Sequence, residues 1–453
     1  MVLRNAVFEF YRSVISSLVR KDRLFSIFTF MDSTNFTIPI SKVHAVKLSS
    51  AGEKSVRQEH PWVYESSVSK LDDDFQSGDI SVIYGKKSNK LIGVGLLDKE
   101  SMIRIRMLTF GKGAKLNQDF FNLRVQEAYA QRIPLLETDT TSFRLLFGEN
   151  DGMPGCIVDV YEHAAVMKWY SLCWQPFLPL LVEAILSINP SLEKLRKKLI
   201  STIVLRLSRN ASKSPFLSND LKDGMVIHGN LKDEVVVFRE YGVLFSAHLI
   251  KGHKTGYFLD HRDNRRMVGA YAQSKSVLDV FSYAGGFSVH ALAGGARSVT
   301  SVDISKQALE LASQNAALNG NFKNHECLAG DAFEIMNRLV KEKKKFDLIV
   351  VDPPSFAKRA DEIPSAINSY NRLINLTLRL ASKNAILVMA SCTSRVSSDQ
   401  FFEIMEAALI KARRSPHIGI RNFKILDKTF HDIDHPIAFP EGAYLKTIYV
   451  QLL

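Results

Sequence analysis

Four short apolar segments after residue 265 constrain the fold of this chain more than any other feature, because helical stretches separate them. The segments are SVLDVFS (276–282), SVTSVDIS (298–305), FDLIVVDPP (346–354) and NAILVMASC (384–392). Such alternation predicts βαβ units and a mostly parallel sheet, with ligands at the carboxyl ends of the strands. We therefore expect an α/β fold with a Rossmann-like domain over residues 251–453.

The region before this domain begins with short alternating stretches separated by turns over residues 41–112, which predict a small β domain. In IRIRMLT (103–109) the apolar residues alternate with Arg104 and Arg106. Because side chains alternate between the two faces of a strand, we expect both guanidinium groups on one solvated, basic face.

Residues 113–250 mix helical and strand-like stretches, and they predict a middle α+β domain. Residues 1–40 are rich in basic and aromatic side chains. We interpret them as an N-terminal extension of a chain that could equally begin at Met31.

The charge balance favours a polyanionic partner. Lysine and arginine number 59 against 47 acidic residues, which gives a net charge of +12. The four cysteines form no close pairs, so we expect neither a CxxC metal site nor disulfides, and we expect a reducing cytoplasm. The longest apolar stretch, residues 169–188, is interrupted by Gln175, Pro176, Pro179 and Glu183, so we expect no membrane span.

The turn after the first of the four strands has the composition of a nucleotide-binding turn. In VLDVFSYAGGFSVHALAGG (277–295), Asp279 comes near the end of a strand and a glycine pair precedes a probable helix. Backbone N–H groups at such a helix start can meet a polar ligand, and glycine permits close approach. Asp303 ends the next strand, where a Rossmann-like fold binds ribose hydroxyls. A glycine pair alone is also compatible with any tight βα turn.

The later strand ends carry further acids, Asp331 in CLAGDAF and Asp352 in DPPSF. This series resembles the class I S-adenosylmethionine-dependent methyltransferases, and the turn lacks the G-x-G-x-x-G spacing of NAD-binding dehydrogenases. The resemblance implies that the methionine part of S-adenosylmethionine lies by Asp279 and the turn, the ribose by Asp303, and the adenine by Asp331. The other cofactor-binding residues it implies are Phe281, Ser282, Tyr283, Ala284, Gly285, Gly286, Ile304, Ala332 and the neighbouring Phe333.

The methyl acceptor is suggested by Asp352 and the stiff Pro353–Pro354 pair before Phe356. A fixed backbone that presents a carboxylate and an aromatic ring suits a planar nucleobase. Related motifs belong to enzymes that methylate exocyclic amines, so this motif does not choose carbon over nitrogen.

Cys392 favours methylation at a carbon atom. It follows a strand and precedes a probable helix, whose start would favour a thiolate. Cytosine C5 becomes nucleophilic when a thiolate adds to C6, and Asp352 would assist by hydrogen bonding the base. A buried cysteine can also be merely a small apolar residue.

A resemblance over the chain from Val43 to Leu453 is more specific. The chain resembles the RlmI-like family of bacterial ribosomal RNA large-subunit methyltransferases, which join a PUA domain and a middle domain to a Rossmann-like catalytic domain. The matching segments are HPWVYESSV (60–68), IRIRMLT (103–109), RLLFGENDGMPGCIVDVY (144–161), KTGYFLDHRDNRR (254–266), DVFSYAGGFS (279–288), DPPSFAK (352–358), SCTSRVSSDQF (391–401) and DHPIAFPEGAYLK (434–446).

The family resemblance implies 5-methylcytosine formation in large-subunit (23S) ribosomal RNA, with Cys392 as the nucleophile. Other cytosine-C5 RNA methyltransferases place a product-releasing cysteine just after the proline of this motif, whereas this chain has Pro354 and Ser355. Release of the methylated base from the cysteine must therefore use another base or water. A related branch with a similar FLDHR segment methylates guanine N7, and His261 keeps that alternative open.

Four further expectations concern binding. Tyr257, with Phe258, would wall the cofactor pocket, and Arg262 would pair with the cofactor carboxylate. Arg104 and Arg106 would hold RNA phosphates, and the target base must be flipped or unpaired. The alternatives are a PUA-type RNA-binding protein without catalysis and an NAD-dependent oxidoreductase; the sequence leaves a homodimer open.

Overall fold

The computed structural model describes residues 40–252, 254–320, 323–413 and 422–453. The described residues belong to one compact unit. The predicted N-terminal extension over residues 1–40 lies almost entirely outside the described residues.

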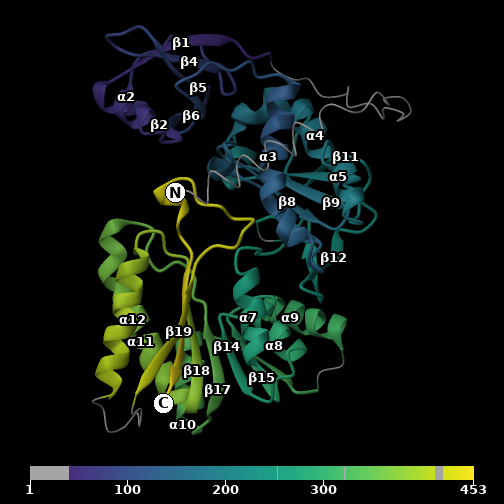
Figure 1. The fold of residues 1–453 in the computed structure, drawn as a ribbon, viewed down its shortest axis with the longest axis vertical. Helices are drawn as coiled ribbons and strands as arrows, with labels where there is room; N and C mark the ends of the chain where they lie inside the picture. The colour runs from purple at the N-terminus through teal and green to yellow at the C-terminus, as the bar shows by residue number, and fades with distance from the viewer. Residues whose placement is uncertain (1–39, 253, 321–322, 414–421) are drawn as a thin grey trace. The chain divides into compact units, whose positions relative to one another are not determined.

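The C-terminal part of the chain contains a seven-stranded sheet in the order β16-β15-β14-β17-β18-β20-β19 (Figure 1). β14 to β18 are parallel, and β20 is antiparallel to both of its neighbours. The strands are β14 (Ser276–Val280), β15 (Ser298–Asp303), β16 (His325–Ala329), β17 (Phe346–Val351), β18 (Ala381–Ser391), β19 (Phe423–Thr429) and β20 (Lys446–Leu452). The order reverses between β14 and β17, which creates a switch point where ligands bind in open α/β sheets.

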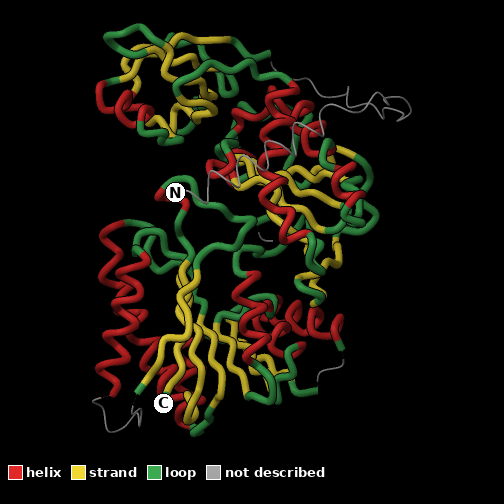
Figure 2. The backbone as a smooth tube through the Cα atoms, in the orientation of Figure 1, coloured by secondary structure: helices red, strands yellow, loops and turns green. Residues whose placement is uncertain are grey.

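Helices cover both faces of this sheet (Figure 2). They are α7 (Arg262–Tyr271), α8 (Gly286–Ala293), α9 (Lys306–Asn319), α10 (Ala332–Lys341), α11 (Ile363–Leu380) and α12 (Ser398–Arg413). One apolar core joins α10, α11 and α12 to the sheet, and it contains Leu373, Phe401 and Ile349. The other includes Val289 of α8 and Val350 of β17. The two cores confirm the predicted α/β, Rossmann-like fold.

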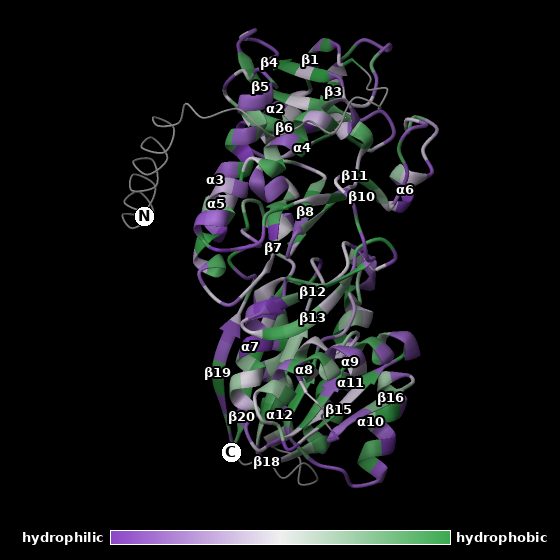
Figure 3. Ribbon diagram, turned by 90° about the vertical axis from the view of Figure 1, so that its right-hand side faces the viewer, coloured by the Kyte–Doolittle hydropathy of each residue, from purple (hydrophilic) through white to green (hydrophobic). Residues whose placement is uncertain are grey.

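The edge strand β19 shows why this sheet ends there. Its sequence FKILDKT contains no fully buried residue, and it is mostly hydrophilic in Figure 3. Charged side chains on an edge strand discourage pairing with a further strand.

The first β region is a six-stranded sheet in the order β2-β6-β5-β4-β1-β3. Its elements are β1 (Val43–Leu48), α2 (Ser50–Arg57), β2 (Trp62–Tyr64), η1 (Glu65–Ser67), β3 (Val68–Lys70), β4 (Ile80–Tyr84), β5 (Leu91–Leu97) and β6 (Ile103–Phe110). A separate small core that includes Val46, Ile83 and Ile105 stabilises it.

The middle region has a five-stranded sheet in the order β11-β10-β9-β8-β7. Its elements are α3 (Gln118–Leu136), β7 (Ser142–Phe147), η2 (Gly148–Asp151), β8 (Cys156–Tyr161), β9 (Ala164–Trp169), η3 (Leu172–Phe177), α4 (Leu178–Leu186), α5 (Asn189–Lys194), β10 (Thr202–Leu207), α6 (Arg209–Ser212) and β11 (Met225–His228). The hairpin of β12 (Val235–Glu240) and β13 (Val243–His248) follows, and its Phe238 and Phe245 join the core beneath α8.

One helical stretch in the described part of the chain, Leu172–Lys194, is long and apolar enough to cross a membrane by length and composition. Its most apolar window is 61% buried inside the fold, as in the core helix of a globular protein. The stretch is therefore weak evidence for a membrane span.

Candidate active site

The turn after β14 has an unusual backbone that is fixed by neighbouring strands. Phe281 and Tyr283 have left-handed φ angles of 67° and 47°, which non-glycine residues rarely adopt. The N–H groups of Phe281 and Ser282 donate to the carbonyl of Val302, and that of Tyr283 donates to Asp303 Oδ2 at 2.9 Å. Backbone strain of this kind is kept where the surroundings enforce it, often at binding sites.

The two glycines of the turn are required for different reasons. Gly285 has a φ of 76°, and a Cβ there would lie 2.7 Å from that of Ala312. A Cβ on Gly286 would lie 2.7 Å from Arg265 Cδ and 2.8 Å from the hydroxyl of Tyr257. Both positions are therefore too crowded for a side chain, so the turn can pack closely against α9, Arg265 and Tyr257.

Three buried polar atoms near this turn have no hydrogen-bond partner: Asp279 Oδ1, Ser282 Oγ and Tyr257 Oη. Asp279 is completely buried, and its other oxygen accepts hydrogen bonds from the N–H and hydroxyl of Ser288 at 3.0 and 2.6 Å. Burial, with the charges of Asp352 and Asp303, raises the pKa of Asp279 to about 7. Because unpartnered buried groups are costly, these atoms fit a polar ligand such as the amino-acid end of S-adenosylmethionine.

The predicted ribose and adenine residues lie on adjacent strand ends. Asp303 accepts from the N–H of Ser305, and its own carbonyl accepts from Gly330, so the loops after β15 and β16 are joined. Ile304 is 77% exposed, which is unusual for isoleucine and leaves an apolar surface beside Asp303. Asp331 is exposed and caps α10 through the N–H of Glu334. Ala332 is buried and Phe333 half-buried. The binding of the cofactor by these residues stays a prediction.

The catalytic residues predicted from the sequence lie at the ends of β17 and β18, which are adjacent strands. Cys392 is half-buried, and its Sγ lies 3.8 Å from the carbonyl oxygen of Pro353. The N–H of Phe356 donates to Thr393 Oγ1, so the DPPSF loop and the loop after Cys392 are hydrogen bonded to each other. Phe356 is half-buried and Pro354 exposed, while Pro353 is buried.

The expected help to the Cys392 thiolate from a helix start is contradicted. The helix α12 begins only at Ser398, after a turn. Burial, with the charges of Asp352 and Asp260, raises the pKa of Cys392 to about 12. The cysteine is therefore a thiol in the free protein, and its proton must leave during the reaction.

Lys446, at the start of β20, was not predicted as a site residue. Its buried Nζ donates to the carbonyls of Thr393, Val396 and Tyr444 at 2.5, 2.6 and 3.2 Å. It thus holds the loop that follows Cys392, and burial lowers the pKa of Lys446 to about 8. The only signal in the sequence is a lysine directly before the apolar strand TIYV.

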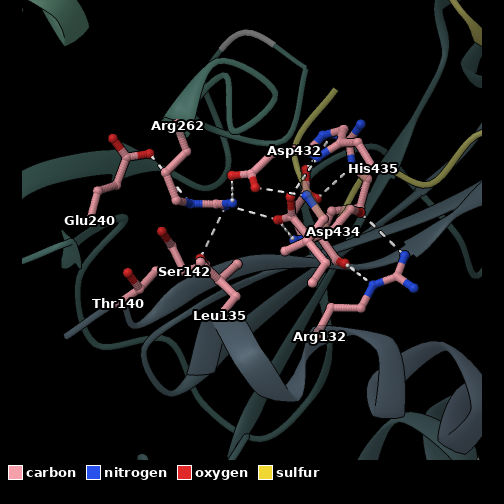
Figure 4. A network of polar contacts seen from close by, with 12 residues as sticks. Arg132, Leu135, Thr140, Ser142, Glu240, Arg262, Asp432, Asp434 and His435 are labelled. Carbon is pink, nitrogen blue, oxygen red and sulfur yellow. Dashed lines mark hydrogen bonds and ion pairs between the residues drawn. The ribbon is translucent and has the colours of Figure 1, made fainter. Parts of the chain in front are cut away.

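Arg262 contradicts its predicted role. The side chain is completely buried; Nη1 lies 2.8 Å from Asp432, and Nη2 lies 2.8 Å from Asp434 and donates to the carbonyl of Ser142 (Figure 4). Its guanidinium ends are therefore occupied by this protein and do not point to a cofactor carboxylate. The partners Asp432 and Asp434 lie far along the chain, so Arg262 could not be assigned from its own motif.

The predicted basic face of β6 is also wrong. Arg106 is only 6% exposed and pairs with Asp98 at 3.2 Å and with Glu149 at 3.6 Å. Arg104 pairs with Glu65 at 2.8 Å and donates to two backbone carbonyls. The alternation of the strand is real, but acidic partners neutralise both guanidinium groups.

Tyr257 is buried against Phe238 and Phe245 with only its hydroxyl at the turn, and its contact with a cofactor stays a prediction. Among the residues that the structure describes, no group of three or more His, Cys, Asp or Glu side chains could hold a metal ion.

Comparisons with known proteins agree with this architecture. Residues 228–420 match the domain family described as S-adenosylmethionine-dependent methyltransferase, and residues 46–110 match the PUA-like domain. A ribosomal RNA large subunit methyltransferase of Deinococcus radiodurans is 38% identical over 90% of this chain and 97% of its own length. Ribosomal RNA large subunit methyltransferase I of Aeromonas salmonicida is 33% identical over 88% of this chain and 97% of its own.

A solved structure from Streptococcus mutans, assigned as an S-adenosylmethionine-dependent methyltransferase, has the same fold. Its TM-score is 0.72 at 22% identity, and the match covers 90% of this chain and 99% of that one. A second methyltransferase structure with the same TM-score holds S-adenosylhomocysteine.

Proposed function

This chain belongs to the family of S-adenosylmethionine-dependent ribosomal RNA large subunit methyltransferases, and we propose that it forms 5-methylcytosine in that RNA with Cys392 as nucleophile. The observation that carries the proposal is the placement of Cys392 beside the Asp352–Pro353 segment, on adjacent strand ends. A thiol and a carboxylate at one site are what C5 chemistry requires, because an uncatalysed C5 atom does not attack a methyl group.

The proposed reaction has three steps, in which Cys392 and Asp352 act on the base. As the sulfur of Cys392 forms a bond to C6, the C5–C6 double bond opens; Asp352, which hydrogen bonds the N3 and amino side of the base, takes up the thiol proton and passes it to N3. C5 would then form a bond to the methyl group as the methyl–sulfur bond of bound S-adenosylmethionine breaks, which would leave S-adenosylhomocysteine. A water molecule or another base would take the C5 proton, so that the C5–C6 double bond re-forms and the cysteine sulfur leaves as thiolate, which regains its proton from N3 through Asp352.

The residues of this chain also determine how the cofactor is held. Asp279, Ser282 and Tyr257 offer their unpartnered polar atoms to the amino-acid end, and Asp303 offers a carboxylate to the ribose. Asp331, Ile304 and Phe333 would surround the adenine.

Access to C5 requires a base outside the helical stack, because C5 and C6 must be reached from the face of the ring. The exposed Pro354 and the half-buried Phe356 flank the position where a planar base would lie. The net charge of +12 favours RNA as the partner, although Arg104 and Arg106 do not contribute to that contact. We place the enzyme in the cytoplasm, and a homodimer stays a prediction.

A second candidate, methylation of guanine N7 or of an amine on the same RNA, is favoured by one observation. The pKa of Cys392 near 12 makes a thiolate costly, and nitrogen chemistry needs no thiolate. The retained Cys392, Asp352 and cofactor turn argue against an RNA-binding protein without catalysis.

The test compares ribosomal RNA from cells with and without the protein by mass spectrometry of digested fragments. We expect one 5-methylcytosine to disappear in the deletion, and Cys392→Ala to fail to restore it while S-adenosylmethionine binding is retained. Cys327→Ala is the matched control, since Cys327 is also half-buried in the same domain but lies at β16 beside His325. A mark restored by Cys392→Ala, or a lost mark on guanine, would favour the nitrogen candidate.

A further inference from the structure

The imidazole of His261 is buried beside the proposed catalytic carboxylate without a hydrogen bond from its Nε2. The residue is 6% exposed, and Nε2 lies 3.4 Å from Asp352 Oδ1. Phe287 packs edge-on against the ring at 5.5 Å and limits its rotation. A buried, unpartnered nitrogen aimed at a partly exposed carboxylate is a contact that can shorten when the substrate binds.

Asn264 determines which imidazole nitrogen carries the proton. Its amide Nδ2 donates to His261 Nδ1 at 3.1 Å. The orientation of that amide is fixed, because its Oδ1 accepts from the hydroxyls of Thr429 at 2.5 Å and Tyr449 at 2.9 Å. Nδ1 is therefore an acceptor, so the neutral ring carries its proton on Nε2, towards Asp352.

We propose that His261 is a positioning residue of the methyl-transfer reaction, which donates its Nε2 proton to Asp352 and orients that carboxylate against the acceptor base. The inference rests on the proposed function of Asp352. Asp352 accepts this hydrogen bond with one oxygen and keeps the other for the base. The chain Tyr449, Asn264, His261, Asp352 links β20 to the end of β17 through α7.

The neutral form of His261 is the working form, which makes the reaction pH-dependent. Burial lowers the pKa of His261, but the charges of Asp352 and Asp260 outweigh burial and Arg265, so the net shift is upward from 6.5. A second proton would have to go on Nδ1, against the Asn264 amide, and the resulting cation would pair with Asp352. The cation would still donate from Nε2, but its charge would hold Asp352 in an ion pair and weaken that carboxylate as a hydrogen-bond acceptor for the base, so activity should fall as the pH falls through the pKa of His261.

The other groups that face this pair also titrate or carry charge. His431 contributes to the charge environment of His261, while Cys392, Asp279 and Tyr370 face Asp352. Asp279 titrates near pH 7, so the profile is measured at saturating S-adenosylmethionine to keep cofactor binding from limiting the rate.

The experiment measures kcat and KM for methyl transfer to ribosomal RNA between pH 5.5 and 8.5 in the wild type, His261→Gln and His261→Leu. Glutamine retains an N–H donor at similar reach but does not titrate. In the wild type we expect kcat to fall at low pH with the slope of a single protonation. This fall should be absent in His261→Gln, whose kcat at pH 8 should stay within about threefold of the wild-type value. His261→Leu should lose about tenfold or more in kcat with little change in KM, the scale of one positioned polar group in catalysis.

An acid limb that persists unchanged in His261→Gln, or a His261→Leu enzyme with full kcat, would overturn the positioning role. If His261→Leu does not fold, the pH profile of kcat in His261→Gln tests the positioning role by itself. Asn264→Asp gives an independent check. An aspartate would accept a hydrogen bond from Nδ1–H and stabilise the protonated ring, so the fall in kcat should move to higher pH. Failure of the proposed function is separate: the wild-type product would then contain no 5-methylcytosine.

Discussion

Two buried groups of ionisable side chains in this protein are satisfied to different degrees. The first, which we call the Arg262 network, consists of Arg132, Asp151, Glu240, Arg262, Arg265, Asp432 and Asp434. The second, the turn site, consists of Asp279, Ser282, Tyr257 and His261. In the network every carboxylate forms an ion pair with a guanidinium group, and Arg262 Nε, which makes no hydrogen bond, lies 3.8 Å from Glu240 Oε2. Every member of the turn site has a buried polar atom without a hydrogen-bond partner. Burial within ion pairs indicates a structural role, whereas unpartnered buried polar atoms indicate a place for a ligand or a reaction.

Two buried carboxyl groups, Glu240 in the network and Asp279 in the turn site, have pKa shifts in opposite directions. In the network burial alone would raise the pKa of Glu240, but Arg265 and His290 lower it to about 2. In the turn site burial outweighs the hydrogen bonds from Ser288, and the pKa of Asp279 rises to about 7. Glu240 therefore stabilises the fold above pH 4.5 and loses that contribution as the pH falls towards 2. Asp279 has the opposite effect, since its stability contribution is lost as the pH rises from about 4 to 7.

The largest expected effect is on stability in the Arg262 network. Arg262→Met removes the cation and leaves Asp432, Asp434 and Glu240 buried together, so we expect a loss of about 3–5 kcal/mol in the free energy of unfolding. Denaturant unfolding measures it. The matched control on the same helix is Arg266→Met, whose exposed pair with Asp263 should contribute less than about 1 kcal/mol. Equal losses in the two variants would contradict the distinction between the network and the surface.

The next effect concerns pH at the turn site. Asp279→Asn removes a carboxylate that is unfavourable to bury in its ionised form, so the variant without ligand should gain stability relative to the wild type above pH 7, by up to about 4 kcal/mol. Unfolding curves at pH 4 and pH 8 give the comparison, and the gain should be nearly absent at pH 4, close to the pKa of an unfolded aspartate. A difference between variant and wild type that does not change with pH would show that Asp279 is not held as an acid.

The smallest effect is expected for the arginine that sequence analysis assigned to RNA. Arg106→Met should lower the free energy of unfolding by about 1–3 kcal/mol, less than Arg262→Met, because Ser171 still donates a hydrogen bond to Asp98. The dependence of RNA affinity on salt concentration should keep its slope, because a paired guanidinium releases no counterion from phosphate. A slope reduced by about one unit would restore Arg106 to the RNA contact.

The sequence predicted those parts of the site that depend on local periodicity. Parallel strands bring their carboxyl ends together, so Asp279, Asp303, Asp352 and Cys392 could be placed at one edge of the sheet from the strand pattern alone. The polar or charged residue after each apolar run was enough to identify these positions as candidates for the site.

The partners of buried arginines could not be predicted in the same way. Arg262 and Arg106 lie in motifs that resemble ligand-binding or RNA-binding segments. Their carboxylate partners include Asp434 and Glu149, respectively, and these residues are remote in sequence from the motifs. Lys446 and Asn264 were missed for a related reason, because their importance comes from hydrogen bonds to the Cys392 loop and to His261. A single sequence contains no signal for such pairings.

The most direct test of the central claim is a covalent trap. Large-subunit ribosomal RNA that contains 5-fluorocytidine cannot lose a proton from C5 after methyl transfer, so the bond between the enzyme and C6 should persist. We predict that mass spectrometry of the digested complex will find the methylated nucleotide attached to the peptide that contains Cys392, and that Cys392→Ala will give no adduct. Methylation of ordinary RNA by an enzyme that never forms this adduct would contradict the C5 mechanism.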